Sequence, residues 1–146
     1  MIPFASRSHE YTKDERALVD HVMTTASPLT QGRYLRQLEL DFSEFIGVAH
    51  SFAVSNATSG LELAAQLCQF STGDEVIVPA HTFTSSAYPF AKHGGRLVWA
   101  DIDLYTRVVG VEQIEKCISP HTKAVVVPHL YGYVADMQDI MELCRQ

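Results

Sequence analysis

The sequence predicts an α/β fold, a mostly parallel sheet with helices on both faces. Short runs of β-branched residues alternate with helical patterns from Phe52 onward. The runs 75–79 and 124–128 are apolar at nearly every position, which is typical of strands covered by helices on both sides. Turn residues separate the runs, such as Gly73-Asp74 before one strand and Gly94-Gly95 before the next.

The composition is that of a globular protein of modest size, with 146 residues, 47% of them hydrophobic. A net charge of −6 and scattered Lys and Arg residues argue against a nucleic-acid surface. No basic segment precedes an apolar run at the N-terminus, and no run reaches the roughly 18 apolar residues of a membrane span. We therefore expect a cytoplasmic protein with neither membrane nor nucleic acid among its partners.

Residues 1–50 are expected to form a helical leader. Thr12 and Glu15 match a capping box at the start of one helix, and Gly47 is placed to end a second helix. Residues 51–146 then form the α/β part. Its expected strands are 52–55, 75–79, 96–101 and 124–128, and its expected helices are 61–70, 85–93, 112–118 and 136–145.

Ligands of such sheets collect where the carboxyl ends of strands meet helix N-termini. After the first expected strand, the small residue Ala57 allows close approach to the backbone, and Thr58 and Ser59 offer hydroxyls beside free helix amides. This pattern favours an anion site, although Ser, Thr and Asn also begin helices that bind nothing. The segment SNATSG matches neither nucleotide-binding glycine motif, which weakens a doubly wound nucleotide-binding domain as an alternative.

Aromatic and imidazole groups follow two further strands. Phe83 lies in a polar loop, where its ring can stack on a planar ligand or pack beneath the loop as core. His129 and Tyr131 follow the last strand at the same edge, and either can be structural. The seven histidines show no zinc-like spacing, so we expect no metal site.

Taken together, many correctly spaced segments resemble the sugar aminotransferase family of the DegT/DnrJ/StrS type. They are IPF near the start, LTQGRYLRQLELDFSEFIGVAH, VSNATSGLELA, GDEVIVPAHTFTSSA, WADIDLYT and SPHTKAVVVPHLYGYVADMQDIMELCR. The resemblance implies the N-terminal portion of the large domain of a fold type I enzyme that uses pyridoxal 5'-phosphate (PLP). It also implies a homodimer whose substrates are a keto sugar nucleotide and an amino acid donor, with glutamate as the first candidate.

The resemblance also assigns roles to residues. Thr58 and Ser59 fall where the family binds the PLP phosphate, with Ala57 where many members have glycine, and Phe83 falls where a ring stacks on the pyridine. The loop Thr30-Gln31-Gly32 falls near the active site at the dimer contact. The turn from His129 to Gly132, with Tyr131, borders the cofactor pocket.

The family places its Schiff-base lysine and the aspartate on the pyridine nitrogen after the position of Gln146, so we name no catalytic residue. We expect a truncated aminotransferase with an incomplete PLP-binding domain at 51–146, poor solubility, no activity by itself and weak or absent PLP binding. One alternative is a fragment of a PLP-dependent sugar dehydratase, in which a histidine replaces the lysine. Another is a non-catalytic partner of a full-length homologue.

Overall fold

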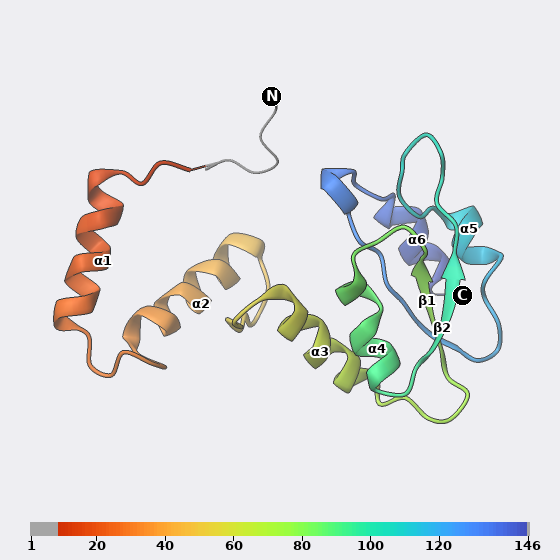
Figure 1. The fold of residues 1–146 in the computed structure, drawn as a ribbon, viewed down its shortest axis with the longest axis horizontal. Coiled ribbons are helices and arrows are strands. Elements are labelled where there is room, and N and C mark those ends of the chain that lie inside the picture. The colour runs from red at the N-terminus through yellow and green to blue at the C-terminus, as the bar shows by residue number, and fades with distance from the viewer. Residues whose placement is uncertain (1–8, 146) are drawn as a thin grey trace. The chain divides into compact units, whose positions relative to one another are not determined.

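A computed structural model describes residues 9–145 of the chain (Figure 1). The IPF segment at residues 2–4 lies outside the described residues. Contacts divide the chain into two compact units, residues 1–53 and residues 54–146, and each is taken by itself below. None of the helices in the described part of the chain is long and apolar enough to cross a membrane.

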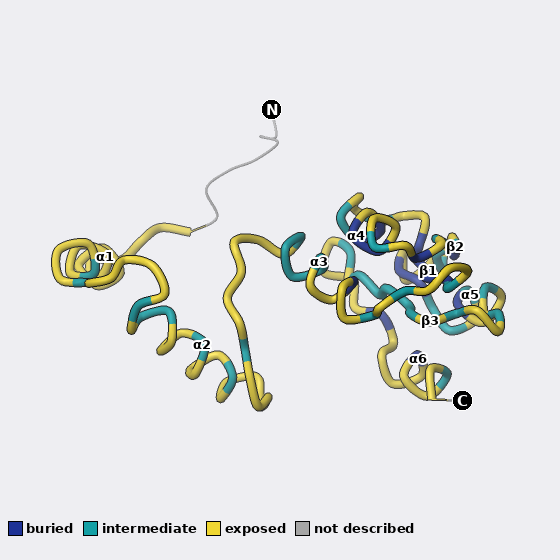
Figure 2. The backbone as a smooth tube through the Cα atoms, turned by 90° about the horizontal axis from the view of Figure 1, so that it is seen from below, coloured by how far each residue is buried: buried dark blue, intermediate teal, exposed yellow. Residues whose placement is uncertain are grey.

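The first unit contains helices α1 (Lys13–Thr25) and α2 (Arg33–Ile46). The predicted capping box is confirmed, because Thr12 Oγ1 accepts from the Glu15 amide at 3.2 Å and Glu15 Oε2 accepts from the Thr12 amide at 2.7 Å. Gly47 ends α2 as predicted, with a φ of 77° that suits glycine. Neither helix contains a buried residue, which Figure 2 shows as yellow and teal along both.

The second unit is built on a three-stranded parallel sheet. Its strands are β1 (Glu75–Pro79), β2 (Arg96–Ala100) and β3 (Thr122–Val125), in the order β2-β1-β3. The elements around the sheet are α3 (Ala57–Cys68), η1 (Thr84–Ser86), α4 (Tyr88–Lys92), α5 (Val111–Glu115), η2 (Leu130–Gly132) and α6 (Met137–Leu143). The predicted α/β class with a parallel sheet is therefore confirmed.

The central strand β1 is buried along its whole length, because side chains on both of its faces enter a core. Ile77 packs in a cluster with Ile114 of α5 and Ile140 of α6. Val76 and Val78 point to the opposite face and pack in a cluster that includes Phe90 of α4. The alternation of the strand side chains thus places helices on both faces of the sheet, as its apolar sequence predicted.

The strand predicted at 52–55 was wrong, since these residues form no strand. A strand needs a neighbouring backbone to pair with, and no described residue pairs with this segment. Phe52 and Val54 accordingly remain 79% and 42% exposed. The apolar pattern indicated a β tendency but carried no information about the partner.

The helix predicted at 85–93 is split into η1 and α4. Pro89 explains the break, since its ring in a continuous α-helix clashes with the carbonyl of Ser85 one turn earlier. In the structure Pro89 occupies the first turn of a new helix, where its missing N–H costs nothing. The split places Phe83 directly before η1.

Candidate cofactor-binding site

The first part of the candidate site is the N-terminus of α3. Asn56 caps the helix, its Oδ1 accepting from the Ser59 amide at 2.9 Å. Ser59 Oγ lies 3.1 Å from Ser55 Oγ and 3.3 Å from Asn56 Oδ1, so the Ser59 hydroxyl is already engaged. The capping interpretation of this segment is thus correct for Asn56.

Capping leaves donors free at the same helix end. Across residues 9–145, no group accepts a hydrogen bond from the amide of Ala57 or of Thr58, and the Thr58 hydroxyl forms none. Two unpaired amides and one hydroxyl at a helix N-terminus form a set of donors suited to an anion. The positive end of the macrodipole of the 12-residue helix α3 lies here and favours negative charge.

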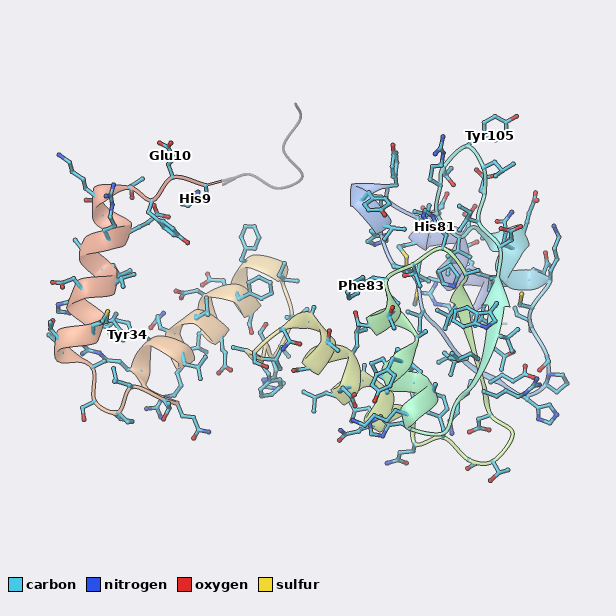
Figure 3. All side chains as sticks on the ribbon, in the orientation of Figure 1. His9, Glu10, Tyr34, His81, Phe83 and Tyr105 are labelled. Carbon is cyan, nitrogen blue, oxygen red and sulfur yellow. The ribbon has the colours of Figure 1, made fainter. Side chains whose placement is uncertain are left out.

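The second part is the loop between β1 and η1, which carries Phe83. Phe83 is 69% exposed, so its ring does not pack as core among the described residues. Thr82 Oγ1 donates to Ser86 Oγ at 2.9 Å and so ties the loop to η1, which packs against α3. The Phe83 loop and α3 are therefore neighbours, and Figure 3 shows His81 and Phe83 on this loop.

The third part is the turn after β3. His129 Nδ1 accepts a 3.2 Å hydrogen bond from the Ala135 amide. Tyr131, at the middle of η2, has a φ of 56° and a ring that is 82% exposed. The Tyr131 ring lies 6.1 Å from the His81 ring, centroid to centroid. The turns after the adjacent strands β1 and β3 thus meet at the carboxyl edge of the sheet, as predicted for parallel strands.

His81 was not singled out in the sequence. A histidine in a polar loop carries no signal of its own, and only the pairing of β1 with β3 brings it to Tyr131. The sequence predicted parallel strands but not the order β2-β1-β3, which makes the turns after β1 and β3 adjacent, so the contact between the two rings could not be predicted.

The loop Thr30-Gln31-Gly32 belongs to the first unit, and its role near an active site stays a prediction. Gln31 has a φ of 53°, and Gly32 forms the N-cap position of α2. A Cβ on Gly32 would lie 2.6 Å from the Pro28 carbonyl oxygen, so this position admits only glycine without a shift of backbone. The glycine is thus explained by close packing within the loop itself.

Acidic groups of the second unit have structural partners. The Thr106 and Tyr105 amides donate to Asp103 Oδ1 at 2.7 and 2.9 Å and lower the pKa of Asp103, which is therefore a turn former. Within residues 9–145, no three His, Cys, Asp or Glu side chains are grouped so as to hold a metal ion.

Comparison with known proteins decides the family. The family model of the DegT/DnrJ/EryC1/StrS aminotransferases matches residues 9–146. The chain belongs to this aminotransferase family. The resemblance inferred from the sequence segments is thereby confirmed.

Individual members of the DegT/DnrJ/EryC1/StrS family give the same result. The chain is 34% identical over 133 residues to GDP-perosamine synthase from Vibrio cholerae, covering 91% of this chain and 36% of that protein. The crystal structure of an aminotransferase from Psychrobacter cryohalolentis superposes with a TM-score of 0.87 at 31% identity, covering 98% of this chain and 36% of that one.

A second catalytic type occurs among the similar structures. Escherichia coli GDP-4-keto-6-deoxy-D-mannose-3-dehydratase with bound hydrated PLP superposes with a TM-score of 0.86 at 25% identity, over 98% of this chain and 38% of that chain. The present chain thus spans somewhat more than a third of the length of each of these three relatives.

Proposed function

We propose that the protein carrying these residues is a PLP-dependent aminotransferase that moves an amino group from an amino acid to a keto sugar nucleotide. Glutamate is the donor to test first. The observation that carries the proposal is the set of free donors at Ala57 and Thr58 on α3, the helix that η1 behind the exposed Phe83 packs against, in a member of a sugar aminotransferase family.

The donors of α3 fit a phosphate ester. The amides of Ala57 and Thr58 and the Thr58 hydroxyl are unpaired within the described residues, and each can donate to a phosphate oxygen. Ser59 would add less, because its amide is already bonded to Asn56 Oδ1. We therefore assign the main part of phosphate binding to Ala57 and Thr58, with Ser59 next to them.

The Phe83 ring fits the planar part of the same cofactor. It lies in the loop directly before η1, which packs against α3, and it is 69% exposed and so open to a ligand. Stacking on a pyridine ring would bury it and orient the cofactor. His129 and Tyr131 lie on the neighbouring loop and would border the pocket.

When bound, PLP supplies the electron sink that lets an amino group leave one carbon and join another. The residues described here would hold the phosphate, orient the ring and exclude water from one face of it. The proton-transferring lysine and the aspartate on the pyridine nitrogen are not assigned to any residue of this chain. These 146 residues alone are accordingly proposed to bind PLP weakly or not at all and to lack transaminase activity.

A PLP-dependent sugar dehydratase is the second candidate. The similarity to the E. coli dehydratase supports it, since that structure matches nearly the whole chain as closely in TM-score as the aminotransferase does. The two reactions share the phosphate and ring contacts, so residues 57–59 and 83 serve either one. A homodimer, and a role for Thr30-Gln31-Gly32 at its contact, belong to both candidates.

A single assay separates the candidates. The intact protein, reconstituted with PLP, is incubated with glutamate and a keto sugar nucleotide, and the products are resolved by mass spectrometry. An amino sugar nucleotide together with 2-oxoglutarate supports the aminotransferase. Loss of water from the sugar without a gain of nitrogen supports the dehydratase, and neither product with any of the keto sugars tested contradicts both.

A further inference from the structure

Two rings from different loops meet at the carboxyl edge of the sheet. His81 follows β1 and Tyr131 follows β3, and their ring centroids are 6.1 Å apart with an interplanar angle of 56°. Both residues are exposed, Tyr131 at 82%. Within the described residues neither side chain forms a hydrogen bond to a neighbour, so the imidazole and the phenol both keep their polar atoms available to a ligand.

The loop holds Tyr131 in an unusual backbone conformation. Tyr131 and Gly132 both have positive φ values, 56° and 84°. A left-handed tyrosine costs free energy relative to the extended or helical regions, and such residues persist where the surroundings hold them in place. This backbone conformation turns the Tyr131 ring outward rather than into the core. The loop therefore sets the orientation of the ring.

His129 is the residue that holds this loop. Its carbonyl accepts from the Gly132 amide at 3.1 Å, and its Nδ1 accepts from the Ala135 amide at 3.2 Å. Ala135 is 3% exposed and belongs to the core, so the imidazole links the turn to a buried position. Because Nδ1 accepts an N–H, its proton must be on Nε2.

The geometry points to His81 and Tyr131 as a pair that contacts the sugar ring of the amino acceptor and selects among sugars, with His129 as the positioning residue for Tyr131. This rests on the proposed function. His81 lies two residues before Phe83 on one loop, so it lies near the group that would stack on the cofactor ring. In an amino transfer the reacting carbon of the acceptor must approach that ring, and this carbon belongs to the sugar.

The chemistry of the pair suits a sugar better than a nucleotide. Each ring offers an apolar face for the C–H groups of a sugar and a polar atom for its hydroxyls. Neither ring is the guanidinium or ammonium group that commonly recognises a diphosphate. We therefore expect the pair to affect the affinity for the sugar and to leave that for the nucleoside diphosphate unchanged.

Calorimetry on the intact, PLP-loaded protein tests this directly. The ligands are the unreactive GDP-mannose and UDP-N-acetylglucosamine, with GDP and UDP as the same ligands without the sugar. For whichever nucleotide binds, His81→Ala and Tyr131→Ala should each weaken binding of the nucleotide sugar about tenfold. The affinity for the corresponding nucleoside diphosphate should not change. Tyr105→Ala is the matched control, because Tyr105 is a 95% exposed tyrosine of the same unit without an aromatic partner among the described residues.

The positioning role of His129 has its own pair of variants. His129→Ala removes the acceptor for the Ala135 amide and should weaken binding of the nucleotide sugar as Tyr131→Ala does. His129→Asn retains an oxygen acceptor close to the place of Nδ1 and should restore most of the affinity. An equal loss of affinity for the nucleotide sugar in both variants contradicts the proposal that His129 positions Tyr131 through Nδ1.

The proposed function and this inference fail in different ways. A wild-type protein that does not bind PLP, or does not react with glutamate, contradicts the proposed function and removes the basis of the inference. A wild-type protein that does both, with variants at 81 and 131 that bind the nucleotide sugar as tightly as wild type, overturns the inference alone. Thermal melts equal to wild type show that the exposed substitutions leave the fold intact.

Discussion

The Ser119 hydroxyl donates a 2.5 Å hydrogen bond to Oε2 of Glu75, the first residue of β1. The other carboxylate oxygen, Oε1, pairs with the guanidinium of Arg96 at the start of β2. Glu75 is 3% exposed, so these two partners satisfy a charge that would otherwise be buried alone. One carboxylate thus joins β1, β2 and the turn into β3 at the amino-terminal edge, opposite the candidate site.

Glu75→Gln should destabilise the protein, because an amide cannot accept from both partners and one donor is left unsatisfied. We expect a loss of about 1–3 kcal/mol in the free energy of unfolding. Urea denaturation of the intact protein measures it. Glu115→Gln is the control, since Glu115 is exposed and its side chain forms no hydrogen bond within the described residues. An equal shift of both midpoints would contradict the assigned role of Glu75.

Glu62 should make stability depend on pH. Its carboxylate accepts from His93 Nε2 at 2.9 Å and Lys92 Nζ at 3.0 Å, joining α3 to the end of α4. These bonds, that of His93 foremost, lower the pKa of Glu62 from its ordinary 4.5. A carboxylate with a lowered folded pKa contributes its full stabilisation above the unfolded value and loses it as the pH falls through the folded value.

Glu62→Gln should therefore lower the denaturation midpoint at pH 7, and the difference from wild type should shrink as the pH falls below 4.5. Urea titrations across this range measure the difference. Glu142→Gln, an exposed substitution on α6, serves as control. A wild-type advantage that stays constant down to strongly acidic pH would show that the ion pairs are not its source.

Gly32→Ala should disturb the loop before α2. The new Cβ would lie 2.6 Å from the Pro28 carbonyl oxygen, which is backbone and cannot rotate away. We expect a loss of roughly 1–3 kcal/mol, the usual cost of forcing atoms into a packed position. Gly60→Ala makes a useful contrast, since its Cβ would meet nothing closer than 3.8 Å and alanine favours helices. Comparable losses in the two variants would refute the steric argument.

Much of the fold was predictable because local patterns determine it. Thr12 and Glu15 form the capping box, Gly47 ends α2, and the apolar run 75–79 is the fully buried β1. These features depend on neighbours in sequence or on burial, which side-chain chemistry reports directly. The sequence segments around Thr58, Phe83 and His129 likewise identified the aminotransferase family.

Features that depend on distant partners were not predictable. The segment at 52–55 has strand composition but lacks a pairing strand among the described residues, and the helix expected at 85–93 is interrupted at Ala87, ahead of Pro89. The sequence left Phe83 undecided between core and ligand contact, and only its 69% exposure separates them. The interest of His81 comes only from its contact with Tyr131, which follows a different strand of the sheet.

The central claim is that the free donors at the N-terminus of α3 bind the phosphate of PLP. A titration of the intact protein with PLP, followed by absorbance, tests it most directly in wild type, Thr58→Ala and Thr72→Ala. Thr72 is an exposed threonine in the turn before β1, at the opposite edge of the sheet. The account predicts saturable binding that Thr58→Ala weakens about tenfold and Thr72→Ala leaves unchanged. Binding unaffected by Thr58→Ala, or no saturable binding by the wild-type protein, would contradict it.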